Sequence, residues 1–190
     1  LFAGLPRLLR QRPWLRRLTL WRNASPLLSR LGERWLGIAA SRTLPVPAVQ
    51  AYQPPAAAST LSERRVLLLV DTFASHFEPR IAQAAYAVLH AAGYQVEVLR
   101  PLADDAEPSR SLCCGRTYLS LGQVEAARAE AVRLHAALAP ALASGTPIIG
   151  LEPSCILSLR DDHLKLGLGE TAHQLSRQVF LFEEFIAREH

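Results

Sequence analysis

The chain has 190 residues, of which 49% are hydrophobic and 20% are charged, so it can form one domain with a buried core plus an appendage. This composition excludes wholesale disorder, and no uncharged apolar stretch is long enough for a membrane-spanning helix. The three cysteines, without a signal peptide, favour a reducing compartment, where cysteines are metal ligands or reactive thiols. The chain contains no Met and begins at Leu1, which favours a fragment of a longer protein.

Charge is unevenly distributed along the chain. Residues 1–42 carry nine Arg and one acidic residue, a net charge of +8. The remaining residues carry 12 basic and 16 acidic side chains, a net charge of −4. The sequence therefore combines a basic N-terminal segment with a mildly acidic domain.

Residues 1–42 are expected to form short helices that act as a connector or docking segment. Leu and Trp recur at helical spacing through this segment. The segment has no second apolar surface, so we expect Trp14, Trp21 and Trp35 to stay exposed in this chain and to be covered by partner domains. Binding of the Arg-rich segment to anionic lipid or nucleic acid is the alternative; we retain peripheral membrane attachment and expect no nucleic acid partner.

Residues 43–62 contain four prolines and are expected to form an extended linker, with a domain boundary near residue 60. After the linker, residues 63–190 read as one α/β domain. Buried strands are expected at 66–70, 95–99 and 147–151, with helices after Pro79, after Cys114, after Pro153 and over about 171–188. The predicted buried positions on the first, second and last of these helices include Ile81, Val88, Val124, Leu134, Leu138, Leu175, Val179, Phe182 and Ile186.

Alternation of buried strands with amphipathic helices predicts a three-layer, Rossmann-like α/β fold with a mainly parallel sheet and an N-terminal helical appendage. The site of such a sheet lies at the carboxyl ends of its strands. There the sequence places Asp71, the adjacent pair Cys113 and Cys114, and Cys155. No GxGxxG or P-loop motif is present, so nucleotide binding has no motif support.

Thiolates are soft ligands that suit iron–sulfur clusters and zinc, so we expect Cys113, Cys114 and Cys155 to form a metal or thiol site with Asp71 beside them. The alternative is that the cysteines are small buried apolar residues, which we favour for Cys155 considered alone. His76 is a weaker candidate ligand, because a lone loop histidine is usually solvated. Arg116 and Arg160 could neutralise the negative charge of a cluster, but an ordinary surface ion pair is the safer interpretation for both.

Several motifs together resemble the CCG cysteine-rich domain. Residues 112–118 read LCCGRTY, residues 150–155 read GLEPSC and residues 158–160 read SLR. The opening VDTF at 70–73 and FEP at 77–79 looks like the version fused behind a FAD domain. The resemblance covers about residues 60–188, and residues 1–59 look like the connector that follows a ferredoxin-like 4Fe-4S module.

The resemblance implies the C-terminal electron-transfer module of a FAD-linked oxidoreductase similar to D-lactate and D-2-hydroxyglutarate dehydrogenases. FAD and the catalytic flavin domain would lie outside this chain, and the partners would be the flavin and ferredoxin-like domains of the same protein. The hydroxy acid and the electron acceptor stay open. We expect a cytoplasmic protein, with attachment to the inner face of the membrane as an alternative.

The sequence departs from the full family motif at two of five cysteine positions. Asp71 stands near the first, and Glu152 stands where the CxxC needs its first cysteine. The resemblance therefore leaves three possibilities: a 4Fe-4S cubane with three Cys and a fourth ligand such as Asp71 or His76, a zinc ion, or a vestigial site in a structural docking module.

Overall fold

A computed structural model of the chain describes residues 14–55 and 64–189. Four parallel strands form one sheet in the order β2-β1-β3-β4. The strands are β1 (Arg65–Leu69), β2 (Gln95–Val98), β3 (Ile148–Gly150) and β4 (Val179–Leu181). The central strand β1 pairs Arg65 with Gln95 on one side and Leu67 with Ile148 on the other.

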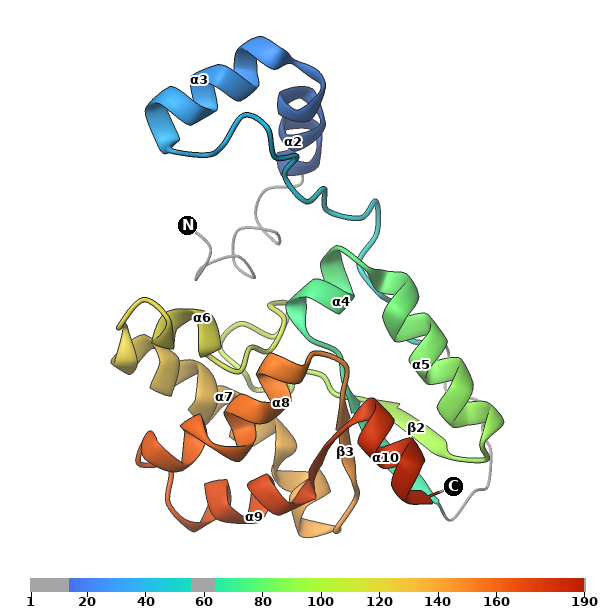
Figure 1. Ribbon diagram of the computed structural model, residues 1–190. Coiled ribbons are helices and arrows are strands. Elements are labelled where there is room, and N and C mark those ends of the chain that lie inside the picture. Colours follow the sequence, from blue (N-terminus) through green and yellow to red (C-terminus); the bar gives the residue numbers. More distant parts are fainter. Residues whose placement is uncertain (1–13, 56–63, 190) are drawn as a thin grey trace.

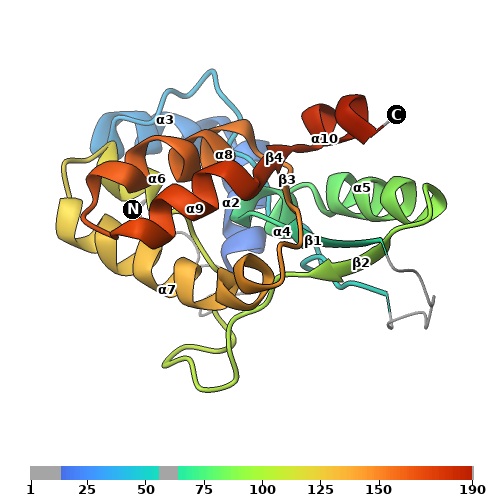
Figure 2. The same cartoon turned by 90° about the horizontal axis from the view of Figure 1, so that it is seen from below.

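Helices cover both faces of this sheet, which gives three layers (Figure 2). One face carries α5 (Pro79–Ala91) and α10 (Phe182–Glu189), and the other carries α7 (Val124–Ala143), α8 (Pro153–Arg160) and α9 (Glu170–Gln178). The shorter helices α4 (Thr72–His76) and α6 (Arg116–Leu119) and the 3-10 helix η1 (Asp162–Lys165) lie in the connections between these longer elements. The predicted α/β class with a parallel sheet is confirmed.

The apolar run in β1 is buried on both faces, as its sequence predicts. Val66 and Leu68 pack in the core beside α5 and α10, whereas Leu67 and Leu69 pack in the core beside α7, α8 and α9. All four side chains are at most 7% exposed. A strand whose alternate residues enter two cores needs no polar face, which is why it reads as a continuous apolar run.

The predicted single helix over about 171–188 is wrong. The structure ends α9 at Gln178, forms β4 over Val179–Leu181 and then starts α10 at Phe182. Val179, Phe180 and Leu181 pair with Ile148, Ile149 and Gly150. Valine and phenylalanine suit a strand, and the tertiary pairing with β3 outweighs the helical spacing that the sequence also shows.

The helix after Cys114 also differs from its prediction, because it is divided into α6 and α7. The turn between them contains Gly122, whose φ of +70° is readily adopted by glycine. Val124, which the spacing placed in the buried stripe, is 50% exposed at the start of α7, while Leu134 and Leu138 are buried as expected. On α5, Ile81 and Val88 are likewise about half exposed, and Ala82, Ala85 and Leu89 form the buried side.

The N-terminal appendage is a helical hairpin of α2 (Leu15–Ala24) and α3 (Pro26–Leu36), set apart from the sheet (Figure 1). The helical prediction for this segment is confirmed over those residues, while residues 1–13 lie outside the described part. Ser25 has an extended backbone between the helices, and its hydroxyl accepts a hydrogen bond from Leu28 N at 3.4 Å. The hairpin leaves Trp14, Trp21 and Trp35 exposed by 48%, 64% and 76%, as predicted.

Polar contacts hold the hairpin to the segment that follows it. The Arg22 guanidinium is buried and donates to Ala39 O at 2.9 Å and to Arg42 O. The Asn23 amide donates to Leu44 O at 2.8 Å and accepts from Leu44 N at 2.9 Å. Backbone groups of the non-helical return segment are thus satisfied by side chains of α2.

Residues 43–55 run without helix or strand, in keeping with the predicted linker. They nevertheless dock on the α/β domain: Ala48 N donates to His76 O at 2.7 Å, and Tyr52 N donates to Ser75 O at 2.8 Å. The Tyr52 side chain is buried. The predicted boundary near residue 60 lies among residues 56–63, outside the described part of the chain.

At the β4 edge of the sheet, an ion pair between Arg160 and Glu184 binds backbone groups of the strand. The Arg160 guanidinium donates from Nε at 3.2 Å and from Nη2 at 2.8 Å to Val179 O of β4, and it forms a bidentate pair with the Glu184 carboxylate. Glu184 also accepts from Leu181 N at 3.0 Å. The pair with Arg160 lowers the pKa of Glu184 to about 2. The ion-pair interpretation of Arg160 is therefore confirmed.

Candidate functional site

The strand order places a crevice between β1 and β3. The chain continues from β1 to β2 on one side of the sheet, and it later returns to form β3 on the other side of β1. At such a reversal, the carboxyl ends of neighbouring strands open a crevice in which α/β proteins place their sites. Asp71 lies just beyond β1, and Cys155 lies in the first turn of α8, just beyond β3.

The structure brings the three cysteines to this crevice. Cys114 Sγ lies 3.2 Å from Cys155 Sγ, and all three thiols are free. Cys113 Sγ accepts a hydrogen bond from Gly115 N at 3.4 Å. Gly115 has a φ of +81°, and a Cβ at this position would lie 2.6 Å from Ala127 O, so the cysteine turn requires glycine.

Mutual contact and burial favour the protonated form of Cys113 and Cys114. The hydrogen bond with Cys114 and then burial raise the pKa of Cys113. For Cys114, the contact with Cys113 lowers the pKa, while the contact with Cys155 and burial raise it, to a net value of about 12. A metal that binds here must displace these protons, so its affinity should rise with pH.

The cavity at the cysteines has a volume of about 60 Å³. It is lined by thiols, by Asp71 and Arg116, and by apolar side chains that include Leu69, Leu112, Phe73 and Leu134. Pockets for organic ligands typically measure about 300–1,000 Å³. The cavity therefore suits an ion or a small inorganic group rather than an organic cofactor.

Asp71 lines this cavity but also has a structural role. Its Oδ1 caps α4 by accepting from Phe73 N at 2.7 Å and from Ala74 N at 3.1 Å. Burial raises the pKa of Asp71, the two amide hydrogen bonds offset part of this effect, and nearby Glu152 raises the pKa further. The helix cap alone is sufficient reason for an aspartate here, so its role as a ligand stays a prediction.

The thiols supply suitable donor atoms, but they do not form a ready-made mononuclear site. Among the described residues, no group of three or more His, Cys, Asp and Glu side chains is arranged to hold a metal ion. Two thiolates bound tetrahedrally to one zinc at about 2.3 Å would be about 3.8 Å apart. The 3.2 Å between Cys114 Sγ and Cys155 Sγ is shorter, so both side chains would have to move apart on loading.

His76 is not brought to the cysteine cavity. It lines a neighbouring pocket of about 360 Å³, together with Tyr52, Leu99 and Ser111. Its Nε2 lies 3.0 Å from Ser111 Oγ, and burial lowers its pKa. The structure thus gives no support to His76 as a fourth ligand and leaves Asp71 as the nearer candidate.

Arg116 does line the cysteine cavity, at the start of α6. Its Nη1 donates to Asp162 Oδ2 at 3.0 Å, and the side chain is half exposed. Arg116 therefore forms the surface ion pair that its sequence context indicated, and it still places a positive charge at the mouth of the cavity.

A pair of histidines beneath the cysteine turn was not anticipated from the sequence. His163 is fully buried, and its Nε2 donates to Cys114 O at 2.8 Å. In neutral His163, Nδ1 is then the acceptor, so His135 Nε2 donates to it at 2.9 Å. Burial lowers the pKa of His163, and burial followed by the charge of His163 lowers that of His135 to about 4. His135 follows Leu134 within the buried stripe of α7, which was the available signal.

Buried charges also fix the loop that leads to the cysteines. Arg110 forms a buried ion pair with Glu130 of α7, in which Nη1 donates to Oε1 at 2.9 Å and to Oε2 at 2.7 Å. Arg133, one turn further along α7, donates to Ser111 O at 3.0 Å and to Arg110 O at 2.7 Å. These side chains look like ordinary charged surface positions in the sequence, so only the structure shows that they hold the cysteine loop against α7.

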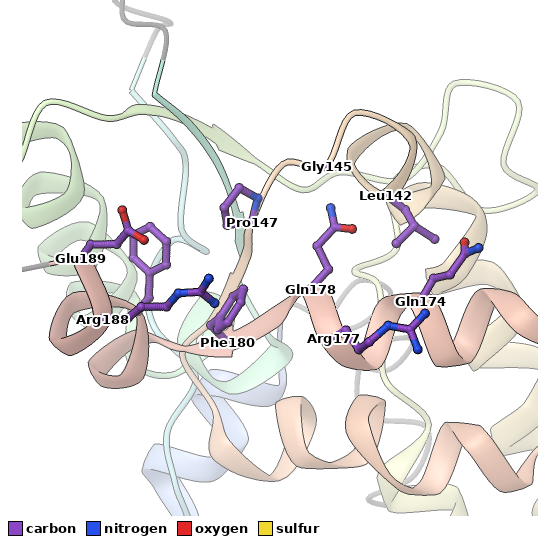
Figure 3. Close-up of a pocket in the computed structure, with 10 residues that line it drawn as sticks. Leu142, Gly145, Pro147, Gln174, Arg177, Gln178, Phe180, Arg188 and Glu189 are labelled. Atoms are coloured by element: carbon purple, nitrogen blue, oxygen red, sulfur yellow. The ribbon is translucent and has the colours of Figure 1, made fainter.

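A larger pocket of about 540 Å³ lies at the opposite edge of the sheet, before the start of β3 (Figure 3). Its polar side chains are already engaged in part: Gln178 Nε2 donates to Ala141 O at 2.8 Å and to Thr146 O at 2.7 Å, and Arg188 stacks over Phe180. None of the residues that line this pocket is a cysteine.

No helix among the described residues is both long and apolar enough to cross a membrane. No family model, curated protein or solved structure matches this chain. The resemblance to the CCG domain therefore rests on its sequence motifs, and the function is proposed from the geometry of the cysteine crevice.

Proposed function

We propose that the chain is the C-terminal electron-transfer module of a FAD-linked 2-hydroxy acid dehydrogenase, with Cys113, Cys114 and Cys155 as ligands of a 4Fe-4S cluster. The observation that carries the proposal is the convergence of three thiols from two separate turns, with Cys114 Sγ and Cys155 Sγ 3.2 Å apart. Chance burial of cysteines as small apolar residues does not require such convergence.

The surroundings of the thiols support a redox-active cluster. The cavity is too small for an organic ligand and is lined largely by apolar side chains. Arg116 at its mouth and the His163 hydrogen bond to Cys114 O are polar groups beside the proposed ligands. Hydrogen bonds, charge and burial of this kind set the potential of a cluster, which passes one electron at a time. In this proposal the electrons come from FAD in the flavin domain, by way of the ferredoxin-like domain.

The second candidate is a zinc-binding or vestigial docking module. It is supported by the 3.2 Å between Cys114 Sγ and Cys155 Sγ, because two thiolates on one zinc ion are about 3.8 Å apart and these side chains would need only a small outward movement to reach that spacing. In this case the domain would have a structural role, and Asp71 would remain a helix cap.

The two candidates differ in their metal content. The purified 190-residue chain would be reconstituted without oxygen using ferrous iron and sulfide, and in parallel with zinc, and then desalted. Iron, acid-labile sulfide and zinc would be counted per chain. We expect iron and sulfide in equal amounts, a visible absorption band and an electron paramagnetic resonance signal after reduction. Stoichiometric zinc without bound iron would support the structural module instead, and retention of neither would show a vestigial site.

Three variants sharpen this test. Cys114→Ser should abolish cluster binding, because Cys114 is the thiol that contacts both other cysteines. Thr117→Ala, which changes a side chain of the same cavity without removing a thiol, is the matched control and should load fully. Arg116→Ala should load fully with an altered reduction potential. Full metal retention in Cys114→Ser would instead show that the cysteine pair is structural.

A further inference from the structure

The helical hairpin carries two exposed apolar stripes. Trp14, at the N-cap of α2, is followed by Leu18 and Trp21 within the helix at spacings of four and three residues, and all three are exposed. On α3, Leu27, Leu31 and Trp35 follow at spacings of four residues, and all three are exposed. Residues at these spacings share one side of a helix, so each helix presents a continuous apolar surface to solvent.

The hairpin has hydrogen bonds of its own that fix its two helices, and the apolar stripes are exposed even though these contacts are formed. The side of α3 that faces α2 carries the buried Ser29, whose hydroxyl donates to Arg22 O at 3.1 Å. Arg22 and Asn23 of α2 bind the return segment at Ala39, Arg42 and Leu44. The hairpin is thus closed by polar contacts on its inner side, and its apolar side chains point outward.

Positive charge lies beside both stripes. Arg17 comes three residues after Trp14, and Arg30 and Arg34 come three residues after Leu27 and Leu31, so each guanidinium flanks an apolar stripe. All three arginines are exposed. Between residues 14 and 42 there are six Arg and one acidic residue, Glu33, a local net charge of +5.

We propose that the α2–α3 hairpin binds the surface of an anionic lipid bilayer, with Trp14, Trp21, Leu27, Leu31 and Trp35 in the headgroup region. Helices that lie in a membrane interface combine Trp and Leu on one side with Arg flanks, as these two do. The near absence of acidic residues adds attraction to anionic lipids, which a stripe covered by a neutral apolar protein surface would not need. This inference does not depend on the proposed function of the cysteines.

The three tryptophans of the chain all lie in the hairpin or at its N-cap, so tryptophan fluorescence, excited selectively over that of the four tyrosines, reports on this region alone. The purified chain would be titrated with vesicles of phosphatidylcholine containing phosphatidylglycerol, and with vesicles of phosphatidylcholine alone. Sedimentation would give the partition constant, and brominated lipids would test the depth of the tryptophans. We expect a blue shift, quenching by brominated lipid and co-sedimentation with the anionic vesicles, all weakened by added salt.

Leu31→Asp tests the apolar stripe, and Val132→Asp on α7 is its matched control, because the two side chains are 49% and 53% exposed and both changes add one negative charge. Leu31→Asp should lower the partition constant at least about tenfold, whereas Val132→Asp should lower it only slightly. The double variant Arg30→Gln/Arg34→Gln should reduce the preference for anionic over neutral vesicles.

Three outcomes would overturn the proposal: no binding to anionic vesicles, equal loss of binding in Leu31→Asp and Val132→Asp, or burial of the tryptophans through self-association without lipid. The last would identify a second copy of the chain as the occupant, and analytical ultracentrifugation would detect it. Cys114→Ser should bind vesicles like the unmodified chain, so a failure of the cysteine proposal leaves this test intact.

Discussion

The α/β domain and the helical hairpin differ in the kind of side chain that they bury. In the α/β domain, Leu68 and Ile149 of neighbouring strands are fully buried, and charged groups such as Arg110 and Glu130 are buried as pairs. In the hairpin, the buried groups are the polar Arg22 and Ser29, and the large apolar side chains face outward. Burial of apolar area is the main source of folding free energy, so the α/β domain is stabilised by its core, whereas the contacts within the hairpin are mainly polar and its apolar side chains remain exposed.

The largest stability effect is expected where the α/β domain buries charge. Arg110→Ala removes the guanidinium from the buried Glu130 carboxylate, and breaking one side of a buried pair typically costs about 3–5 kcal/mol. Denaturant unfolding would measure the loss. Arg65→Ala, which removes an exposed pair with Glu97, is the control and should cost at most about 1 kcal/mol. Similar losses in the two variants would contradict the burial of the Arg110 pair.

An apolar truncation compares the two regions directly. Leu68→Ala in β1 should lower the free energy of unfolding by about 2–5 kcal/mol, because it leaves a cavity between the sheet and α5. Leu27→Ala in α3, made at an exposed leucine, should change it by no more than about 0.5 kcal/mol in the absence of lipid. A large loss in Leu27→Ala would show that the hairpin buries this side chain within the chain after all.

The histidine pair makes the α/β domain sensitive to acid. The pKa of His135 is lowered from 6.5 to about 4, so the unfolded chain binds a proton more readily than the folded chain between these values. Stability should therefore be complete above pH 6.5 and decline as pH falls toward 4, by up to about 3 kcal/mol for this group. Unfolding curves across this pH range would show it, and His135→Gln should flatten the decline. The raised pKa of Asp71 acts in the opposite direction, so a rise in stability on acidification would indicate that Asp71 outweighs the histidines.

The smallest effect is expected at the corner of the hairpin. Ser25→Ala removes the hydroxyl that accepts from Leu28 N, and loss of such a cap costs about 1 kcal/mol. Because the hairpin is set apart from the sheet, the loss should appear as faster hydrogen exchange of α3 amides with little change in the α/β domain. Equal acceleration in both regions would show that they unfold as one cooperative unit.

The local sequence pattern was sufficient to predict much of the α/β domain. The apolar runs of β1 and β3 and the prolines at the starts of α5 and α8 are signals carried by neighbouring residues, and they predicted those elements and the convergence of Asp71 with the cysteines. The resemblance to the CCG domain added a function but no geometry, and it stays a prediction.

The features that the sequence did not predict depend on contacts between segments that are distant in the chain. β4 exists because Val179–Leu181 can pair with β3, and helical spacing in the same residues hid it. The partners His135 and His163 are 28 residues apart, and Arg110 and Glu130 are 20 apart, so neither pair has a local signature. The polar residues that shape the cysteine turn are therefore visible only once the fold is known.

The Arg160–Glu184 pair also affects how readily the β4 edge of the sheet can accept another strand. β4 is the last strand of the sheet, and its outward groups Val179 O and Leu181 N are taken by Arg160 and Glu184. An open strand edge is a template on which another chain can add a strand and begin aggregation. The side chains of Arg160 and Glu184 occupy backbone groups at this edge, so a strand added beside β4 would first have to displace the ion pair.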